Sequence, residues 1–269
     1  MKTICLLNEK GGVGKTTLTT HIAAGLAIRG YRVVLIDADP QGHATFALGM
    51  REEPGLYELL VRDTPFKDVL RYVPPQNYAV PEEPVSGQLF VVPSNVETRN
   101  IANSISDSFK IKQTLQQLED VIDVIVFDTS PTPSLLHGSI YMATDGIVYP
   151  TTCEILSFDG LAKSMVHRQQ AQVARLHFGL HEIALMGIVP TMYRGNTLEH
   201  KENLRSLRER FGKLVWDPMP QRTIWAEAIN ARRPVFSFAP ESKSAKDAWK
   251  LVSRVEGVLH QWREEDERT

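Results

Sequence analysis

A glycine-rich stretch near the N-terminus has the composition of a phosphate-binding loop. Residues 8–17 read NEKGGVGKTT, and they lie between an apolar run, ICLL, and a segment with helical spacing. Glycines lack a Cβ, so successive backbone N–H groups can turn toward phosphate oxygens, and the N-terminus of a following helix adds partial positive charge. The stretch therefore predicts a nucleotide phosphate site of the strand, loop and helix type.

Each residue type in this loop has an expected role in nucleotide binding. We expect Lys15 on the β- and γ-phosphates, the Thr16 hydroxyl on Mg²⁺ and Thr17 on an α-phosphate oxygen. A dinucleotide-binding loop is disfavoured because Thr17 stands where that pattern needs glycine or alanine. A glycine-rich turn that binds nothing is the remaining alternative. The residues expected to surround the phosphates are Gly11, Gly12, Val13, Gly14, Lys15, Thr16 and Thr17.

The loop departs from the pattern G-x-x-x-x-G-K-[ST] at its first position. Counting back from Gly14, Glu9 stands where the first glycine is expected, and Lys10 beside it gives the stretch a second lysine. One lysine is sufficient for the nucleotide of an ordinary P-loop. The residues of the loop by themselves leave the role of Lys10 open.

Three aspartates follow apolar runs that read as strands. Asp37 and Asp39 lie in VLIDADPQG, and Asp128 lies in VIVFDTSP. Open parallel sheets bind ligands at the carboxyl ends of their strands, so all three are expected at one crevice. We expect Thr16 and Asp128 to hold Mg²⁺, Asp128 through a water, and Asp37 to support the water shell of the metal. Asp39 is expected to orient the attacking water, and an aspartate before Pro40 is alternatively a turn starter.

The rest of the chain alternates short apolar runs with helical segments, which predicts βαβ units. Strands are expected at 3–7, 32–36, 89–92, 124–127, 146–149, 184–189 and 214–216. Helices are expected at 15–29, 111–118, 156–177, 198–211 and 243–262, and an irregular loop at the proline-rich segment 73–88. We therefore expect an α/β fold, with a mostly parallel twisted sheet and helices on both faces, that forms a single P-loop NTPase domain over residues 1–269.

Composition places the chain among ordinary globular proteins. Of its 269 residues 42% are hydrophobic and 23% are charged, and the net charge is −2. It has no apolar run long enough to span a bilayer and no signal-peptide layout, so we expect a cytoplasmic protein. The two cysteines, Cys5 and Cys153, lack the spacing of a zinc site or a disulfide framework.

Four segments resemble one family of ATPases. KGGVGKTT at 10–17, IDADPQGHAT at 36–45, IVFDTSPTPS at 125–134 and DGIVYPTTCEILSFDGL at 145–161 resemble the ParA/MinD group, whose Walker A motif is deviant. The similarity is greatest to the Soj-like ParA partition ATPases, and it continues through most of the chain into the final helix. The resemblance implies a Mg²⁺-dependent ATP hydrolase that forms a homodimer around two ATP molecules.

The resemblance also gives Lys10 a role. In that family the equivalent lysine is the signature lysine, which reaches the ATP phosphates of the partner subunit, so Lys10 becomes a nucleotide-binding residue and joins Lys15 and Asp39 as catalytic. The segments after Asp39 and Asp128 resemble two switches that are ordered by the γ-phosphate. The family holds adenine near the positions of Met192 and Pro220, although a methionine at a strand end is alternatively a core residue.

The family further implies what the dimer binds. ATP-bound dimers of the ParA type bind DNA without sequence preference and work with a ParB-like or other adaptor protein, which here implies a nucleoid location in the ATP state. Residues 189–254 hold 13 basic and seven acidic residues, a local charge of +6 that suits a phosphate backbone. Gln221 and Ile224 stand where the family usually has arginine, so the DNA surface departs from the family pattern. The DNA-binding residues we expect are Arg194, Arg222, Arg232 and Arg233.

Two other functions remain open at this point. A MinD-like protein would bind membrane, and the final helix has an apolar stripe that includes Leu251, Val255 and Trp262. A core-packing helix has the same stripe, and the acidic segment 263–269 would be repelled by anionic lipid, so we expect no membrane binding. A metabolic P-loop enzyme, such as a synthetase or kinase, would not need Lys10 and should add its own acid and base groups, which the sequence does not reveal.

Overall fold

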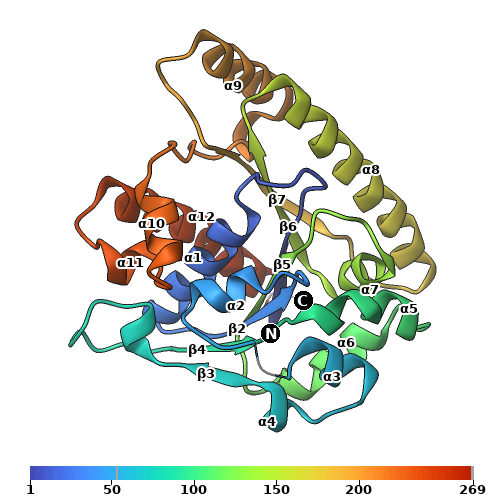
Figure 1. Ribbon diagram of the computed structural model, residues 1–269. Helices are drawn as coiled ribbons and strands as arrows, with labels where there is room; N and C mark the ends of the chain where they lie inside the picture. The colour runs from blue at the N-terminus through green and yellow to red at the C-terminus, as the bar shows by residue number, and fades with distance from the viewer. Residues whose placement is uncertain (53, 268–269) are drawn as a thin grey trace.

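The computed structural model describes residues 1–52 and 54–267, and within them seven strands form one sheet (Figure 1). The strand order is β3-β4-β2-β5-β1-β6-β7, and all neighbours pair in parallel except β3 and β4. The predicted α/β fold with a mostly parallel sheet is confirmed. The strands are β1 (Lys2–Leu6), β2 (Arg32–Ala38), β3 (Arg71–Val73), β4 (Gln88–Val92), β5 (Val124–Thr129), β6 (Gly146–Thr152) and β7 (Ala184–Thr191).

Helices cover both faces of the sheet (Figure 1). The α-helices are α1 (Lys15–Ile28), α2 (His43–Ala47), α3 (Leu56–Val61), α4 (Phe66–Val69), α5 (Ile101–Ser104), α6 (Lys110–Leu115), α7 (Leu135–Ala143), α8 (Ile155–His177), α9 (Leu198–Phe211), α10 (Ile224–Asn230), α11 (Val235–Phe238) and α12 (Lys243–Asp266). The short 3₁₀ helices are η1 (Pro75–Asn77), η2 (Val96–Asn100), η3 (Gln116–Leu118) and η4 (Gly212–Leu214).

The side chains of each strand alternate between two buried layers. In β1, Ile4 and Leu6 pack with α1 and α12, whereas Cys5 packs with the helices on the opposite face. Both faces are covered, which explains why the strands read as continuous apolar runs. At Gly25 of α1 an added Cβ would lie 2.4 Å from a methyl group of Val252, so glycine is required for the close contact of α1 and α12.

The apolar stripe of α12 belongs to this core. Val252 and Val255 are fully buried, and Leu251 and Leu259 nearly so, all in the layer that contains α1. The core-packing interpretation of the final helix is therefore confirmed. Among the described residues we also find no helix long and apolar enough to cross a bilayer.

Several predicted elements need correction. The strand expected at 214–216 is wrong, because η4 occupies 212–214 and only a single bridge joins Val215 to Ile188. Pro218, two residues past Trp216, lacks the N–H that a longer ladder would need. The sequence also gave no indication of β3 or of the short helices α2, α3, α4, α5, α7, α10 and α11. The irregular loop expected at 73–88 is confirmed for residues 74–87, which contain η1 and turns. Its two end residues belong to β3 and β4.

Candidate functional site

The glycine-rich loop lies at the centre of the sheet, between β1 and α1. Gly12 and Gly14 have φ values of 73° and 85°, a left-handed conformation that favours glycine. Gly14 directly precedes the first residue of α1, so the N–H groups at the start of that helix border the loop. The Thr191 hydroxyl at the end of β7 donates to the Val13 carbonyl at 2.8 Å and fixes the loop from the other side.

Lys15 lies inside the loop. Its amine is buried and donates to the carbonyl oxygens of Asn8 at 2.8 Å and Lys10 at 3.2 Å. Burial lowers the pKa of Lys15, and the nearby Asp128 and Asp39 carboxylates oppose this shift. The two carbonyl groups hold the amine over the loop, where a phosphate group would meet a positioned cation.

Thr16 and Asp128, both expected at the metal, are brought into contact. The Thr16 hydroxyl donates to Asp128 Oδ2 at 2.7 Å, and the Thr19 hydroxyl donates to Oδ1 at 3.1 Å. Asp128 is fully buried, and its burial and the neighbouring Asp37 raise its pKa to about 8. A hydroxyl and a buried carboxyl at the end of β5 form an oxygen donor set that suits Mg²⁺, whose charge would offset the lost hydration.

Asp37 is paired with Asp128 in the register of β2 and β5, and its oxygens have partners inside the chain. Oδ2 accepts from the backbone N–H of Thr45 at 2.8 Å and from its hydroxyl at 2.7 Å, and Oδ1 accepts from the Asp39 N–H at 3.3 Å. Burial raises the pKa of Asp37 to about 6, although the Thr45 hydrogen bonds oppose the shift. Asp37 therefore anchors α2 to the end of β2.

Asp39 both begins a turn and lines a cavity beside the glycine-rich loop. Its Oδ1 accepts from the Gln41 N–H at 3.0 Å, as in an aspartate-initiated turn. It also lines a cavity of about 630 Å³ with Gly11, Gly12, Lys15, Thr16, Pro40 and His43. On the far wall of this cavity are residues 130–132, where the Ser130 carbonyl accepts a hydrogen bond of 3.0 Å from the His137 ring. The sequence did not indicate a role for His137.

A second, largely apolar cavity of about 270 Å³ adjoins the first, because both are lined by Gly14, Thr17 and Met192. Met192 and Pro220, the two residues expected near adenine, both line it. Met192 is 41% exposed and has a φ of 50°, so it is not a core residue. The sequence did not identify the α10 residues that complete the wall, because α10 itself was not predicted. These residues are Trp225, Ala226 and Ile229.

Lys15 lines the larger cavity, whereas the Lys10 side chain contacts the start of α8. Lys10 lines neither cavity, and its amine instead donates to Ser157 Oγ at 2.6 Å and lies 3.4 Å from Glu154 Oε2, at the start of α8. The same Glu154 carboxylate lies 3.8 Å from Arg194. Glu9, at the position of the missing glycine, has its Oε1 2.5 Å from Nδ1 of His167 of α8.

The four arginines expected at DNA have different surroundings. Arg222 donates to Asp247 Oδ2 at 2.6 Å and lines the apolar cavity. Arg232, which has a φ of 57°, lies over the Phe46 ring at 4.4 Å. Arg233 is exposed beside it, at the opposite end of α10 from Arg222. Arg194 Nε donates to His200 Nε2 at 3.3 Å, in addition to its ion pair with Glu154.

Comparisons with known proteins agree with this geometry. A family profile described as an AAA domain matches residues 1–178. The chromosome-partitioning ATPase Soj of Thermus thermophilus is 32% identical over 95% of this chain and 95% of its own, and the cell division protein PomZ of Myxococcus xanthus is 33% identical over 93% of this chain and 76% of its own. Among solved structures, a Cyanothece McdA(D38A)–ATP complex has a TM-score of 0.78 at 19% identity and covers 96% of both chains.

Proposed function

This chain belongs to the ParA/MinD family of P-loop ATPases, which partition or position cellular cargo, and on that basis we propose that it is a dimerising ATPase of the ParA type. It hydrolyses ATP to ADP and phosphate, slowly when alone. In its ATP state the homodimer binds DNA without sequence preference. Through a ParB-like or other adaptor protein it segregates or positions a plasmid, a chromosome or a protein cargo. It works in the cytoplasm, on the nucleoid when ATP is bound.

The observation that carries this proposal is the separation of the two lysines. The Lys15 amine is buried and hydrogen-bonded to a carbonyl group of its own loop, so it can serve only the nucleotide of its own chain. Lys10 lies outside both cavities, with its side chain 31% exposed at the start of α8. A cation that is not needed for the chain's own nucleotide and lies near the surface is available to a second nucleotide. A facing subunit would present that nucleotide.

The residues of the two cavities fit ATP with Mg²⁺. The larger cavity has backbone N–H groups, Lys15 and the Thr16–Asp128 pair for the phosphates and metal, and the smaller cavity has an apolar wall for a base. Bound Mg²⁺ supplies charge neutralisation on the β- and γ-phosphate oxygens. Asp39 lines the same cavity as the loop, where its carboxylate can accept a hydrogen bond from a water and orient it. The partner's signature lysine adds a cation from outside.

Two alternatives receive less support. Membrane binding of the MinD kind would need an apolar helix face on the surface, and the stripe of α12 is buried against α1. A metabolic P-loop enzyme would not need Lys10, and the two cavities that adjoin the glycine-rich loop are accounted for by one nucleotide.

An experiment that compares binding to DNA with binding to lipid membranes tests the proposal. The protein is mixed with a labelled DNA duplex of arbitrary sequence, with ATP or ADP and Mg²⁺, while a parallel sample is pelleted with liposomes of anionic lipid. We expect DNA binding with ATP that weakens with added salt, much weaker binding with ADP, and no liposome binding with either nucleotide. ATP-dependent liposome binding without DNA binding would overturn the proposal in favour of the membrane alternative.

A further inference from the structure

Helix α9 has a row of cations that the nucleotide site does not use. Lys201, Arg205 and Arg208 are spaced i, i+4 and i+7, so they lie along one face of the helix. All three are exposed, whereas Leu204 and Leu207 are buried against the sheet. Within residues 1–52 and 54–267 none of these three cations forms an ion pair or a side-chain hydrogen bond. Their charges are therefore available to an outside partner.

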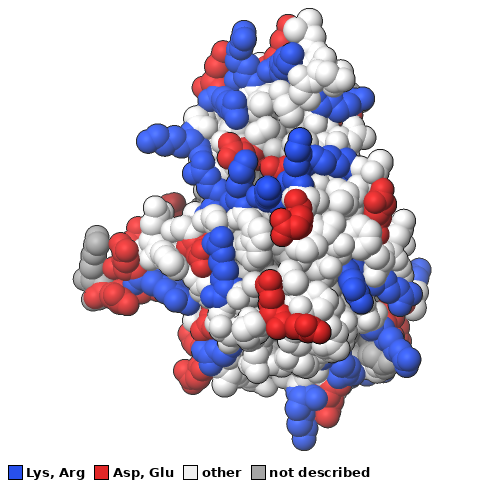
Figure 2. Space-filling model, turned by 90° about the vertical axis from the view of Figure 1, so that its left-hand side faces the viewer, with Lys and Arg blue, Asp and Glu red and all other residues white. Residues whose placement is uncertain are grey.

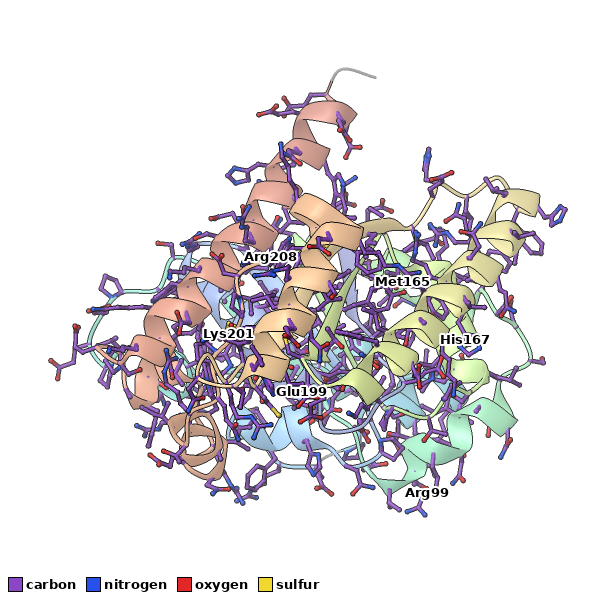
Figure 3. All side chains as sticks on the ribbon, turned by 90° about the horizontal axis from the view of Figure 1, so that it is seen from above. Arg99, Met165, His167, Glu199, Lys201 and Arg208 are labelled. Carbon is purple, nitrogen blue, oxygen red and sulfur yellow. The ribbon has the colours of Figure 1, made fainter. Side chains whose placement is uncertain are left out.

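This row borders a hollow of about 530 Å³, whose wall also includes Tyr193, Leu204 and Glu209, so three cations face one carboxylate there. Figure 3 shows Lys201 and Arg208 one after the other along α9. Figure 2 shows Lys and Arg side chains gathered in the upper half of one face of the molecule, which includes the region of α9. Part of the local positive charge that the sequence indicated therefore lies on this face of the molecule.

Two of the arginines expected from the sequence, Arg222 and Arg232, are less available than the α9 cations. Arg222 is held by Asp247 at 2.6 Å, and the guanidinium of Arg232 lies over Phe46. An arginine that must break a close ion pair or an aromatic contact to bind phosphate loses the free energy of that contact. This loss offsets part of the free energy that the phosphate contact contributes. The three cations of α9 have no such contacts to lose.

We infer that the α9 row, Lys201, Arg205 and Arg208, is the principal contact of the protein with the backbone of duplex DNA. The inference rests on the proposed function and gives its DNA surface a location. Seven residues of helix span about 10 Å, a length over which duplex DNA carries about six phosphate charges. Lysine and arginine contact phosphates without reading bases, as binding without sequence preference requires. The Tyr193 hydroxyl offers a neutral hydrogen-bond donor on the same hollow.

The position of Tyr193 connects this surface to the nucleotide. Its neighbour Met192 lines both nucleotide cavities, and Tyr193 lines the hollow beside α9. The backbone of Tyr193 is bonded on both sides to the segment that walls the base cavity, because its N–H donates to Met219 at 3.0 Å and its carbonyl accepts from Gln221 at 3.0 Å. A nucleotide that orders this segment would also order one wall of the hollow, which gives ATP a route to control DNA binding.

The test neutralises the row and measures how DNA binding depends on salt. The variant combines Lys201→Gln, Arg205→Gln and Arg208→Gln, and the control combines Lys67→Gln, Arg99→Gln and Lys112→Gln, which removes the same charge from α4, η2 and α6. With ATP and Mg²⁺, we expect the α9 variant to lose at least about tenfold in DNA affinity and its log–log salt slope to shrink by about three per protomer. ATP affinity and basal hydrolysis should be unchanged, and the control should bind DNA as the wild type does.

The outcomes separate the inference from the proposed function. If the wild type does not bind DNA at any salt concentration, the DNA part of the proposed function is wrong and the inference falls with it. If the wild type binds and the α9 variant binds equally, or the control loses as much, the inference alone is overturned. In that case the row belongs to another anionic partner, such as an acidic protein segment. A charge-preserving variant, Arg205→Lys with Arg208→Lys, should retain most of the affinity and shows that the loss follows charge and not folding.

Discussion

The Lys10 amine donates a hydrogen bond of 2.6 Å to the Ser157 hydroxyl of its own chain. Ser157 lies in the first turn of α8, and Glu154, the residue that precedes this helix, adds a carboxylate at 3.4 Å. To reach a nucleotide on another subunit, as proposed above, Lys10 would have to leave both groups. Hydrogen bonds of this kind contribute only about 1–3 kcal/mol each, so the ATP phosphates of a facing subunit can compete for the lysine.

Lys10→Ala should separate nucleotide binding from hydrolysis. The variant keeps Lys15 and the cavity, so it should bind ATP with nearly wild-type affinity, but it should remain a monomer and lose on the order of 10³ in turnover, as when a trans-acting cation is removed. Nucleotide titration, light scattering with ATP and phosphate release measure these three properties. Ser157→Ala is the matched control, because it frees Lys10 and keeps its charge. Normal turnover in Lys10→Ala would disprove a role in trans.

Lys15→Ala should remove nucleotide binding itself. The buried amine meets the phosphates directly, and the loss of hydrogen bonds between charged groups weakens affinity by a factor of roughly 10–100 for each bond. Binding of a fluorescent ATP analogue measures the effect. Lys163→Ala, on the exposed side of α8, should bind like the wild type. Retained affinity in Lys15→Ala would contradict the assignment of the loop.

Asp39→Ala should trap the ATP-bound dimer. Asp39 lines the cavity, and among the described residues its carboxylate accepts only the turn hydrogen bond from Gln41, so its loss should leave the fold and ATP binding intact while hydrolysis falls by about 10²–10⁴. Size-exclusion chromatography with ATP should show a persistent dimer. A monomer under these conditions, with normal ATP binding, would show that Asp39 is needed for dimerisation and not for hydrolysis.

Ala226→Trp should block the base and spare the phosphates. Ala226 is exposed on α10 and lines the apolar cavity, so a large side chain can fill that cavity without disturbing the core. We expect ATP affinity to fall at least about tenfold, whereas the affinity for inorganic triphosphate, which has no base, should be unchanged. Ala231→Trp, past the end of the same helix, is the control. Equal loss for both ligands would place the base elsewhere.

His21 should make the fold sensitive to acid. It is buried, its Nε2 accepts from the Val235 N–H at 3.0 Å, and burial lowers its pKa to about 4. Because the folded pKa lies below the ordinary value of 6.5, the stability due to neutral His21 is fully present above pH 6.5 and is lost as the pH falls toward 4. The expected loss is about 2 kcal/mol between pH 7 and pH 5.

Urea unfolding at several pH values measures this effect. The variant His21→Asn should be less stable at pH 7, because Asn fills less of the space beside Trp225 and Phe236, but its stability should change less between pH 7 and pH 5. An unchanged pH dependence in the variant would assign the acid sensitivity to other groups.

The local features of the site were predictable from the sequence because they depend on neighbours along the chain. Glycines 11, 12 and 14 precede a lysine and two threonines, and the strand and helix on either side have clear periodicity. Asp128 was predictable as a partner of Thr16 because parallel strands bring their carboxyl ends to one edge. The family was recognisable from the same short segments.

The remaining features depend on contacts between distant segments. Helix α10, with Trp225 and Ile229, is too short to show a period of its own, and only its packing beside the loop makes it a wall of the base cavity. Arg222 was predicted at DNA, but Asp247 lies on α12 and its approach to Arg222 cannot be read from either segment alone.

The sequence by itself therefore determined the glycine-rich loop, the meeting of Thr16 with Asp128, the sheet and the family of this protein. Only the tertiary structure decided that Lys10 contacts Ser157, that Asp247 pairs with Arg222 and that Glu154 pairs with Arg194. It also decided which cations of α9 have no ion-pair partner among the described residues. The physical reason is that residue type and spacing specify local backbone geometry, whereas the partner of a charged side chain is set by packing between elements far apart in the chain.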